Sequence, residues 1–166
     1  PTEEDEMTIE HAGDSIDNEL ISLICKKYTG AQVTKDMVRK WKEEFSYLSG
    51  DDREHVVELS VDGKKQEVDI GDLVKSACAM IVGKVGGAIK SIVATADPEY
   101  QPILRNNIIL SGGGSLIEGV ADAIANEIAD IGDVTVVCVE DPIEKVATGA
   151  MALAQDMPDE QYTAIN

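Results

Sequence analysis

Hydrophobic residues recur along the first two thirds of the chain at two spacings, which predict its secondary structure. Spacings of three and four residues mark one face of a helix. Helices predicted on this ground span residues 14–28, 34–48 and 71–96. Strict alternation on both sides of Asp62-Gly63, a dipeptide typical of type I′ turns, predicts a hairpin over 57–70. A short strand is expected over 7–10.

The last third of the chain alternates strand and helix patterns. Strands are predicted over 107–111 and 134–139, and helices over 115–130 and 142–156. Residues 134–139 are almost entirely apolar, which is typical of a parallel strand covered on both faces. The crossover between the two strands should be right-handed. We therefore expect an α/β fold, a partial mixed sheet flanked by helices, with a small α+β insert over 29–69.

Three consecutive glycines, Gly112–Gly114, lie between the strand predicted over 107–111 and the helix that follows. Glycine lets the backbone approach a ligand where a Cβ would collide. Ser115 with Glu118 three residues later matches a capping box, which predicts a helix start with free N–H groups suited to a phosphate. Two interpretations stay open at this point, a ligand cradle and a turn that only connects two core elements.

The glycines complete neither of two common nucleotide-binding motifs. A dinucleotide fingerprint would need glycine at Ile117, and a P-loop would need lysine after Gly119, where the chain has Val120. His11 and His55 lie away from cysteines and carboxylate pairs at ligand spacing, so the sequence favours no metal site and no catalytic residue.

Composition narrows the possible partners. The chain has 166 residues, enough for one domain with a sizeable core, and a net charge of −18 from 32 acidic and 14 basic residues. This charge disfavours nucleic acid and anionic membranes, because phosphate binding needs clustered Lys and Arg. Three widely spaced cysteines suit a reducing cytoplasm. No apolar stretch is expected to reach transmembrane length, so we expect no direct membrane insertion.

Several stretches carry a family resemblance. Residues 106–119 resemble the adenosine motif of the superfamily of actin, Hsp70 and sugar kinases, and are most similar to bacterial actins. Residues 140–153 resemble the second helix that connects the two lobes of those proteins. Residues 41–47, with Lys42-Glu43, resemble the insert segment that touches the adenosine. Further stretches are similar to magnetosome actins and span 97–101, 132–142 and 153–158.

The resemblance implies the second lobe of an actin-like (RNase H-like) protein without its first lobe. Its parts would be a large subdomain from 1–28 and 70–157, the small insert over 29–69, and a tail over 158–166. The parent would be a cytoplasmic protein that self-associates into ATP-dependent filaments along magnetosome chains and contacts magnetosome-associated proteins. The alternatives are a cell-shape or cell-division actin, a phosphotransferase of the sugar- or acetate-kinase type, and a stand-alone interaction module.

The same resemblance implies half of a site for ATP or ADP. Its residues would be Gly13, Asp14, Lys42, Glu43, Gly112, Gly113, Gly114 and Ser115. The three glycines would lie against the adenosine and the phosphates, and Ser115 would cap the next helix. Lys42 and Glu43 would approach the adenine and the ribose, with Glu43 accepting from a hydroxyl. Gly13 and Asp14 would lie in the cleft beside the ribose.

The resemblance also predicts what this chain lacks. The phosphate loops and the catalytic acid of the superfamily have no counterpart here, so Mg²⁺ and the γ-phosphate would lack their ligands. We therefore expect weak nucleotide binding or none, and no ATP hydrolysis, by this chain alone. The sheet would lack its centre and leave strand 107–111 with an open edge, which favours strand exchange or self-association.

Overall fold

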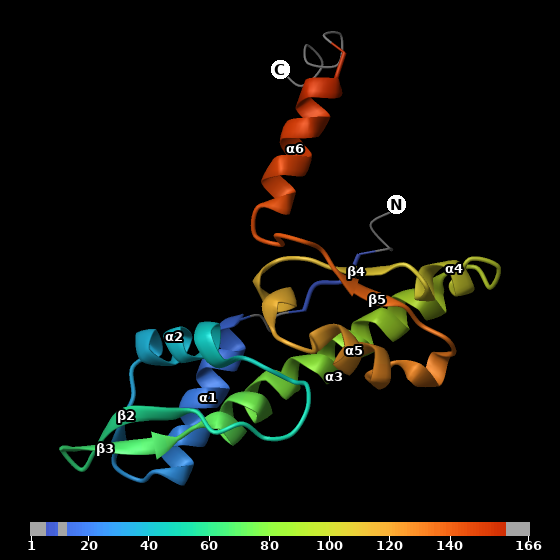
Figure 1. Ribbon diagram of the computed structural model, residues 1–166. Helices are drawn as coiled ribbons and strands as arrows, with labels where there is room; N and C mark the ends of the chain where they lie inside the picture. The colour runs from blue at the N-terminus through green and yellow to red at the C-terminus, as the bar shows by residue number, and fades with distance from the viewer. Residues whose placement is uncertain (1–5, 10–12, 159–166) are drawn as a thin grey trace.

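The computed structural model describes residues 6–9 and 13–158 (Figure 1). The first half of the chain contains α1 (Gly13–Lys27), β1 (Ala31–Gln32), α2 (Lys35–Phe45), β2 (Val56–Val61) and β3 (Lys64–Asp69). The long helix α3 (Gly71–Thr95) follows. The second half contains α4 (Gln101–Arg105), β4 (Ile108–Leu110), α5 (Val120–Glu127), β5 (Val136–Cys138) and α6 (Lys145–Asp156). Two 3-10 helices flank α5, η2 (Gly113–Leu116) and η3 (Ala129–Ile131).

The strands form two small sheets of different type. β1, β2 and β3 are antiparallel, and both central residues of the β2–β3 turn have positive φ (Asp62 51°, Gly63 75°), as a type I′ turn requires. β4 and β5 pair in parallel, with Ile109 opposite Val137. The predicted hairpin and the predicted parallel pair are thus confirmed. Among the described residues, no strand pairs with the other edge of β4.

The core lies along α3, which packs against both α1 and α5 (Figure 1). The helical stripes predicted for the first half face this core. Its buried apolar side chains include Ile16, Leu20, Ile24, Val38, Trp41, Leu59, Val74, Cys78, Val120 and Ile124. Thr34 caps α2 by accepting from the N–H of Met37 at 3.3 Å, so this helix begins where the sequence predicted its start.

By length and composition, α3 is apolar enough to cross a membrane, the only such helix in the described part of the chain. Its most apolar 18-residue window has a mean hydropathy of 1.6. This corrects the expectation that no apolar stretch reaches that length. Core helices of soluble proteins meet the same criterion, and α3 buries Leu73, Val74 and Cys78 in the core.

Two predicted strands differ from the structure. The strand expected over 7–10 is wrong for residues 7–9, which have no strand structure, while residue 10 lies outside the described residues. The strand expected over 134–139 is shorter, and it is not covered on both faces, because Val137 is 49% exposed. Helix α5 packs against β5, and the side chains of Ile109 and Val137 are 63% and 49% exposed.

The segment after the glycines is not the continuous helix predicted over 115–130. It begins with η2, passes through Ile117 in an extended conformation, and reaches Gly119 in the left-handed region (φ 79°). Only then does α5 start, at Val120. The loop between β4 and α5 is therefore longer than the local pattern indicates.

The predicted capping box is also absent, because Glu118 has hydrogen-bond partners that are distant in the sequence. The Ser115 hydroxyl donates to the carbonyl of Gly112 at 2.7 Å instead of capping a helix. The Glu118 carboxylate turns to the insert, where it accepts from the Ser49 hydroxyl and from Nη1 of Arg53, both at 2.7 Å. Glu118 therefore pairs with these distant residues and does not take part in a cap with Ser115.

Backbone contacts at the same place join the insert to the glycine segment. The N–H of Leu48 donates to the carbonyl of Glu118 at 2.7 Å, and Tyr47 forms a parallel bridge with Glu118. A Cβ on Gly119 would lie 2.7 Å from Cβ of Ser49 and 2.8 Å from its backbone nitrogen. We call this contact between 47–53 and 118–119 the insert junction.

We expect Gly119→Ala to destabilise the fold by about 2 kcal/mol or more, because it adds left-handed strain to a backbone collision. Urea unfolding followed by circular dichroism measures the change. Gly114→Ala is the control, since a Cβ there meets nothing within 4 Å and its φ is not positive. Equal unfolding midpoints for the two variants would show that the insert junction does not constrain Gly119.

The insert junction should also make stability depend on pH. Hydrogen bonds from Arg53 and then Ser49 lower the pKa of Glu118 from 4.5 to about 2. The ionised Glu118 carboxylate contributes fully to folding stability above its unfolded pKa near 4.5. This contribution is lost as the pH falls toward its pKa in the folded state, about 2. We expect the difference in Tm between wild type and Glu118→Gln to shrink over this range. A Tm difference that does not change with pH would contradict a stabilising ion pair between Glu118 and Arg53.

Candidate functional site

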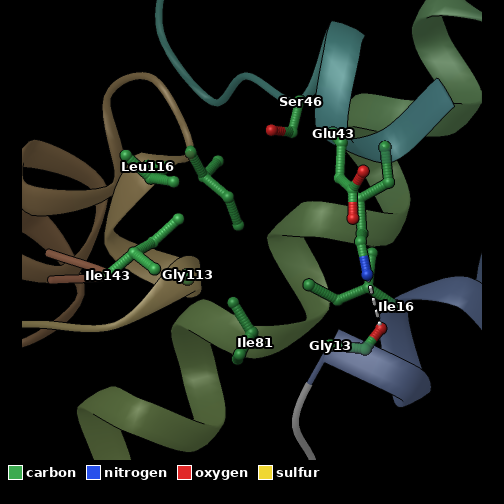
Figure 2. A pocket seen from close by; sticks show the side chains of 11 residues that line it. Gly13, Ile16, Glu43, Ser46, Ile81, Gly113, Leu116 and Ile143 are labelled. Atoms are coloured by element: carbon green, nitrogen blue, oxygen red, sulfur yellow. Dashed lines mark hydrogen bonds between the residues drawn. The ribbon is translucent and has the colours of Figure 1, made fainter. Parts of the chain in front are cut away.

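A cavity of about 470 Å³ lies between α1, α2 and the glycine segment. Figure 2 shows Ile16 and Glu43 on one side, Leu116 and Ile143 on the opposite side, and Ile81 of α3 between them. Elements from both halves of the chain thus line one pocket. Its wall is largely apolar, with the carboxylate of Glu43 among its polar groups.

Five of the eight residues predicted for the site line this cavity. They are Gly13, Lys42, Glu43, Gly113 and Gly114. Gly112 and Ser115 are neighbours of the lining glycines but do not line the cavity, and neither does Asp14. Sequence reasoning missed the apolar lining residues Ile16, Ile81, Leu116, Ile117 and Ile143, together with Ser46. Two of these, Leu116 and Ile117, lie within the motif of residues 106–119, so that motif could have predicted them as lining residues.

The glycine loop leaves room where a ligand could approach. Gly112 has a φ of 84°, a conformation that favours glycine, and its N–H donates to the carbonyl of Pro142 at 3.3 Å. A Cβ on Gly113 or Gly114 would meet nothing within 4 Å. Glycine at these two positions is therefore not required by packing, and both residues line the cavity.

Lys42 is anchored by a buried carboxylate. Its Nζ lies 2.6 Å from Oδ1 of Asp17, whose side chain is 0% exposed. The same Nζ donates to the carbonyl of Gly13 at 3.1 Å, the dashed line beside Gly13 in Figure 2. Nε of Arg39 lies 3.8 Å from the other oxygen of Asp17. The ammonium of Lys42 is thus neutralised within the protein, and its aliphatic stem is the part left to line the cavity.

Asp17 had a recognisable signal in the sequence. It lies beside Ile16 and one turn before Leu20 on the buried face of α1, where an acid needs a partner. Asp14, in contrast, points to solvent and pairs with Lys35 at 3.2 Å. A hydrogen bond from Lys35 is the main cause that lowers the pKa of Asp14. Asp14 acts in this structure as a surface partner of α2.

The arrangement suits a flat, mostly apolar molecule that carries hydroxyl groups. Apolar side chains can enclose a ring, and the Glu43 carboxylate can accept from a hydroxyl. Within the described residues, no group of three His, Cys, Asp or Glu side chains could hold a metal ion.

Together, the α+β insert, the glycine loop after a parallel strand and the cavity between them form the arrangement that the sequence resemblance implies for a lobe of an actin-like protein. The family described as MreB/Mbl protein matches residues 5–162 of this chain. The chain belongs to the MreB/Mbl family of bacterial actin-like proteins.

Relatives and solved structures agree with this assignment. The actin-like protein MamK of Paramagnetospirillum magneticum is 30% identical over 98% of this chain and 47% of its own length. MamK of Magnetospirillum gryphiswaldense is 29% identical, and the cell shape-determining protein Mbl of Bacillus cereus is 26% identical; they are covered over 45% of their lengths. The chain thus spans about half of each relative.

Two solved structures of MamK share the fold. The double helical filament of MamK superposes with a TM-score of 0.89 at 30% identity, covering 95% of this chain and 49% of that one. A non-polymerising MamK mutant bound to AMPPNP superposes with a TM-score of 0.86 at 30% identity, covering 94% and 48%. The predicted fold, a partial actin-like lobe, is confirmed.

We expect Asp17→Asn to destabilise the fold by about 3 kcal/mol, because it leaves the Lys42 ammonium without its buried counter-charge. Asp14→Asn, on the exposed side of the same helix, is the control and should have no measurable effect. The double variant Asp17→Asn/Lys42→Met should recover part of the loss. Urea unfolding measures all three, and an equal loss in both single variants would show that the buried pair is not special.

Proposed function

We propose that this chain is the nucleotide-binding half of a bacterial actin-like protein that forms ATP-dependent filaments. By its resemblance to MamK, such a filament organises magnetosomes in the cytoplasm and contacts magnetosome-associated proteins. The observation that carries the proposal is the convergence of Gly13, Lys42, Glu43, Gly113 and Gly114 on one cavity. One solved structure of MamK is bound to AMPPNP, and another is a double helical filament.

Adenosine is the part of the nucleotide that the cavity fits. Its volume of about 470 Å³ falls in the range of small-molecule sites. The adenine would lie between the apolar side chains and the stem of Lys42, and Glu43 would accept from a ribose hydroxyl. The open space beside Gly113 and Gly114 would let the ligand reach the backbone.

The phosphates would find little support in this chain. The one lysine that lines the cavity, Lys42, is already paired with Asp17, and the chain carries a net charge of −18. We infer that ATP or ADP binds weakly here and that Mg²⁺ and the γ-phosphate need groups from the other half of the family's fold. We expect no hydrolysis by this chain alone.

Membership of the MreB/Mbl family favours the filament function over the phosphotransferase alternative. A cell-shape role stays the second candidate, since Mbl is also a relative.

We propose the division into a large subdomain (1–28 and 70–157) and an insert (29–69) as the domain organisation. The insert junction is the contact that would transmit a movement of one to the other.

Millimolar ADP added to the isotope-labelled chain should shift the amide signals of Gly113 and Gly114 in two-dimensional NMR spectra. Gly114→Ala should weaken binding at least about tenfold, or 1.4 kcal/mol, because its Cβ occupies ligand space without disturbing the fold. Gly83→Ala, on α3 and outside the cavity, is the matched control. Absence of shifts at the two glycines, or equal binding by both variants, would contradict the proposed site.

A further inference from the structure

The side of α2 that faces α1 carries three basic residues, and each of them is paired. Lys35, Arg39 and Lys42 are spaced by four and three residues, so they lie along one side of the helix. Nζ of Lys35 lies 3.2 Å from Asp14, and Nζ of Lys42 lies 2.6 Å from Asp17. Arg39 lies between them, with Nη2 3.6 Å from Asp14 and Nε 3.8 Å from Asp17. The two carboxylates of α1 thus hold all three cations.

The two carboxylates differ in their contact with water. The Asp14 side chain is 68% exposed, so solvent screens its charge. The side chain of Asp17 is fully buried and that of Lys42 is 16% exposed. Charges that are removed from water attract each other strongly, and separating them leaves an unpaired charge at high cost. The Lys42 ammonium is therefore held at the α1 side of the cavity, where the carbonyl of Gly13 also accepts from it.

The pairing decides the charge that a ligand meets. Among the described residues that line the cavity, Lys42 is the one cation and Glu43 the one anion. Asp17, directly behind Lys42, cancels the positive charge, and the Glu43 carboxylate remains. A ligand thus meets a negative site in a chain of net charge −18. Phosphate groups would be repelled there, whereas an uncharged ring with hydroxyl groups would not.

We propose that Asp17 determines the ligand specificity of this cavity, so that the chain prefers an uncharged nucleoside, adenosine, over its phosphorylated forms. The expected order of affinity is adenosine, then AMP, then ADP. Asp17 acts through Lys42 and is a positioning residue, because it does not line the cavity itself. The inference rests on the proposed nucleotide site and adds to it a ranking of ligands and the residue that sets this ranking.

Titration of the isotope-labelled chain with adenosine, AMP and ADP, without divalent cations, tests the ranking. The amide signals of Gly113 and Gly114 report binding. We expect the affinity for ADP to rise from low to high sodium chloride, because salt screens the repulsion, and the affinity for adenosine to stay constant. Tighter binding of ADP than of adenosine at low salt, or weakening of ADP binding by salt, would overturn the proposal.

The ratio of the ADP and adenosine Kd values, measured within each variant, tests the role of Asp17. A general loss of folding weakens both ligands together, so it does not change this ratio. Asp17→Asn frees the Lys42 charge and should shift the ratio at least about fivefold toward ADP. Lys42→Met leaves the Asp17 charge uncompensated and should shift the ratio the opposite way. Asp14→Asn, the same charge change on the exposed side of α1, should shift it less than about twofold.

The double variant Asp17→Asn/Lys42→Met removes both charges and avoids a buried unpaired one. Its ratio should return to the wild-type value, because the cavity then faces the ligand with the same net charge. A selective loss of ADP binding in the double variant would show that Lys42 contacts phosphate and would overturn the role of Asp17. An unchanged ratio in both single variants would overturn that role alone, whereas absence of binding by every ligand would overturn the proposed function as well.

Discussion

The close approach of two backbones at the insert junction is the constraint on which the site depends. Gly119 lies against Ser49 without room for a Cβ, and Glu118 holds Arg53 across the same contact. This fixes the insert against the segment that follows the glycines. Because Glu43 lies on the insert and Gly114 on the facing loop, the cavity exists only while the insert junction is formed.

The cavity has the character of half a site. Its lysine is neutralised by Asp17, which favours contacts made through the stem of Lys42 over attraction of phosphate. The acidic chain as a whole repels a nucleotide polyanion. In the proposed function, binding energy would therefore come from apolar contact and from the ribose hydroxyls, and charge compensation would come from groups outside this chain.

Local signals and distant contacts differ in how well sequence reasoning captured them. The turn at Asp62-Gly63 was predictable because its positive φ values are a property of the two residues themselves. The cap expected at Ser115 was wrong because the partners of Glu118 come from the insert, 65 and 69 residues away. Among the site residues, Asp14 faces solvent because α2 supplies Lys35 as a partner there.

The sequence by itself determined most of the helices, the hairpin, the parallel strand pair and the family likeness of the glycine loop, since periodicity and turn chemistry act over a few residues. It also placed Lys42 and Glu43 near those glycines, through the family resemblance alone. Only the tertiary structure decided that Asp17 neutralises Lys42 and that Glu118 joins the insert. The physical reason is that a carboxylate takes the nearest cation in space, which its neighbours in the sequence do not specify.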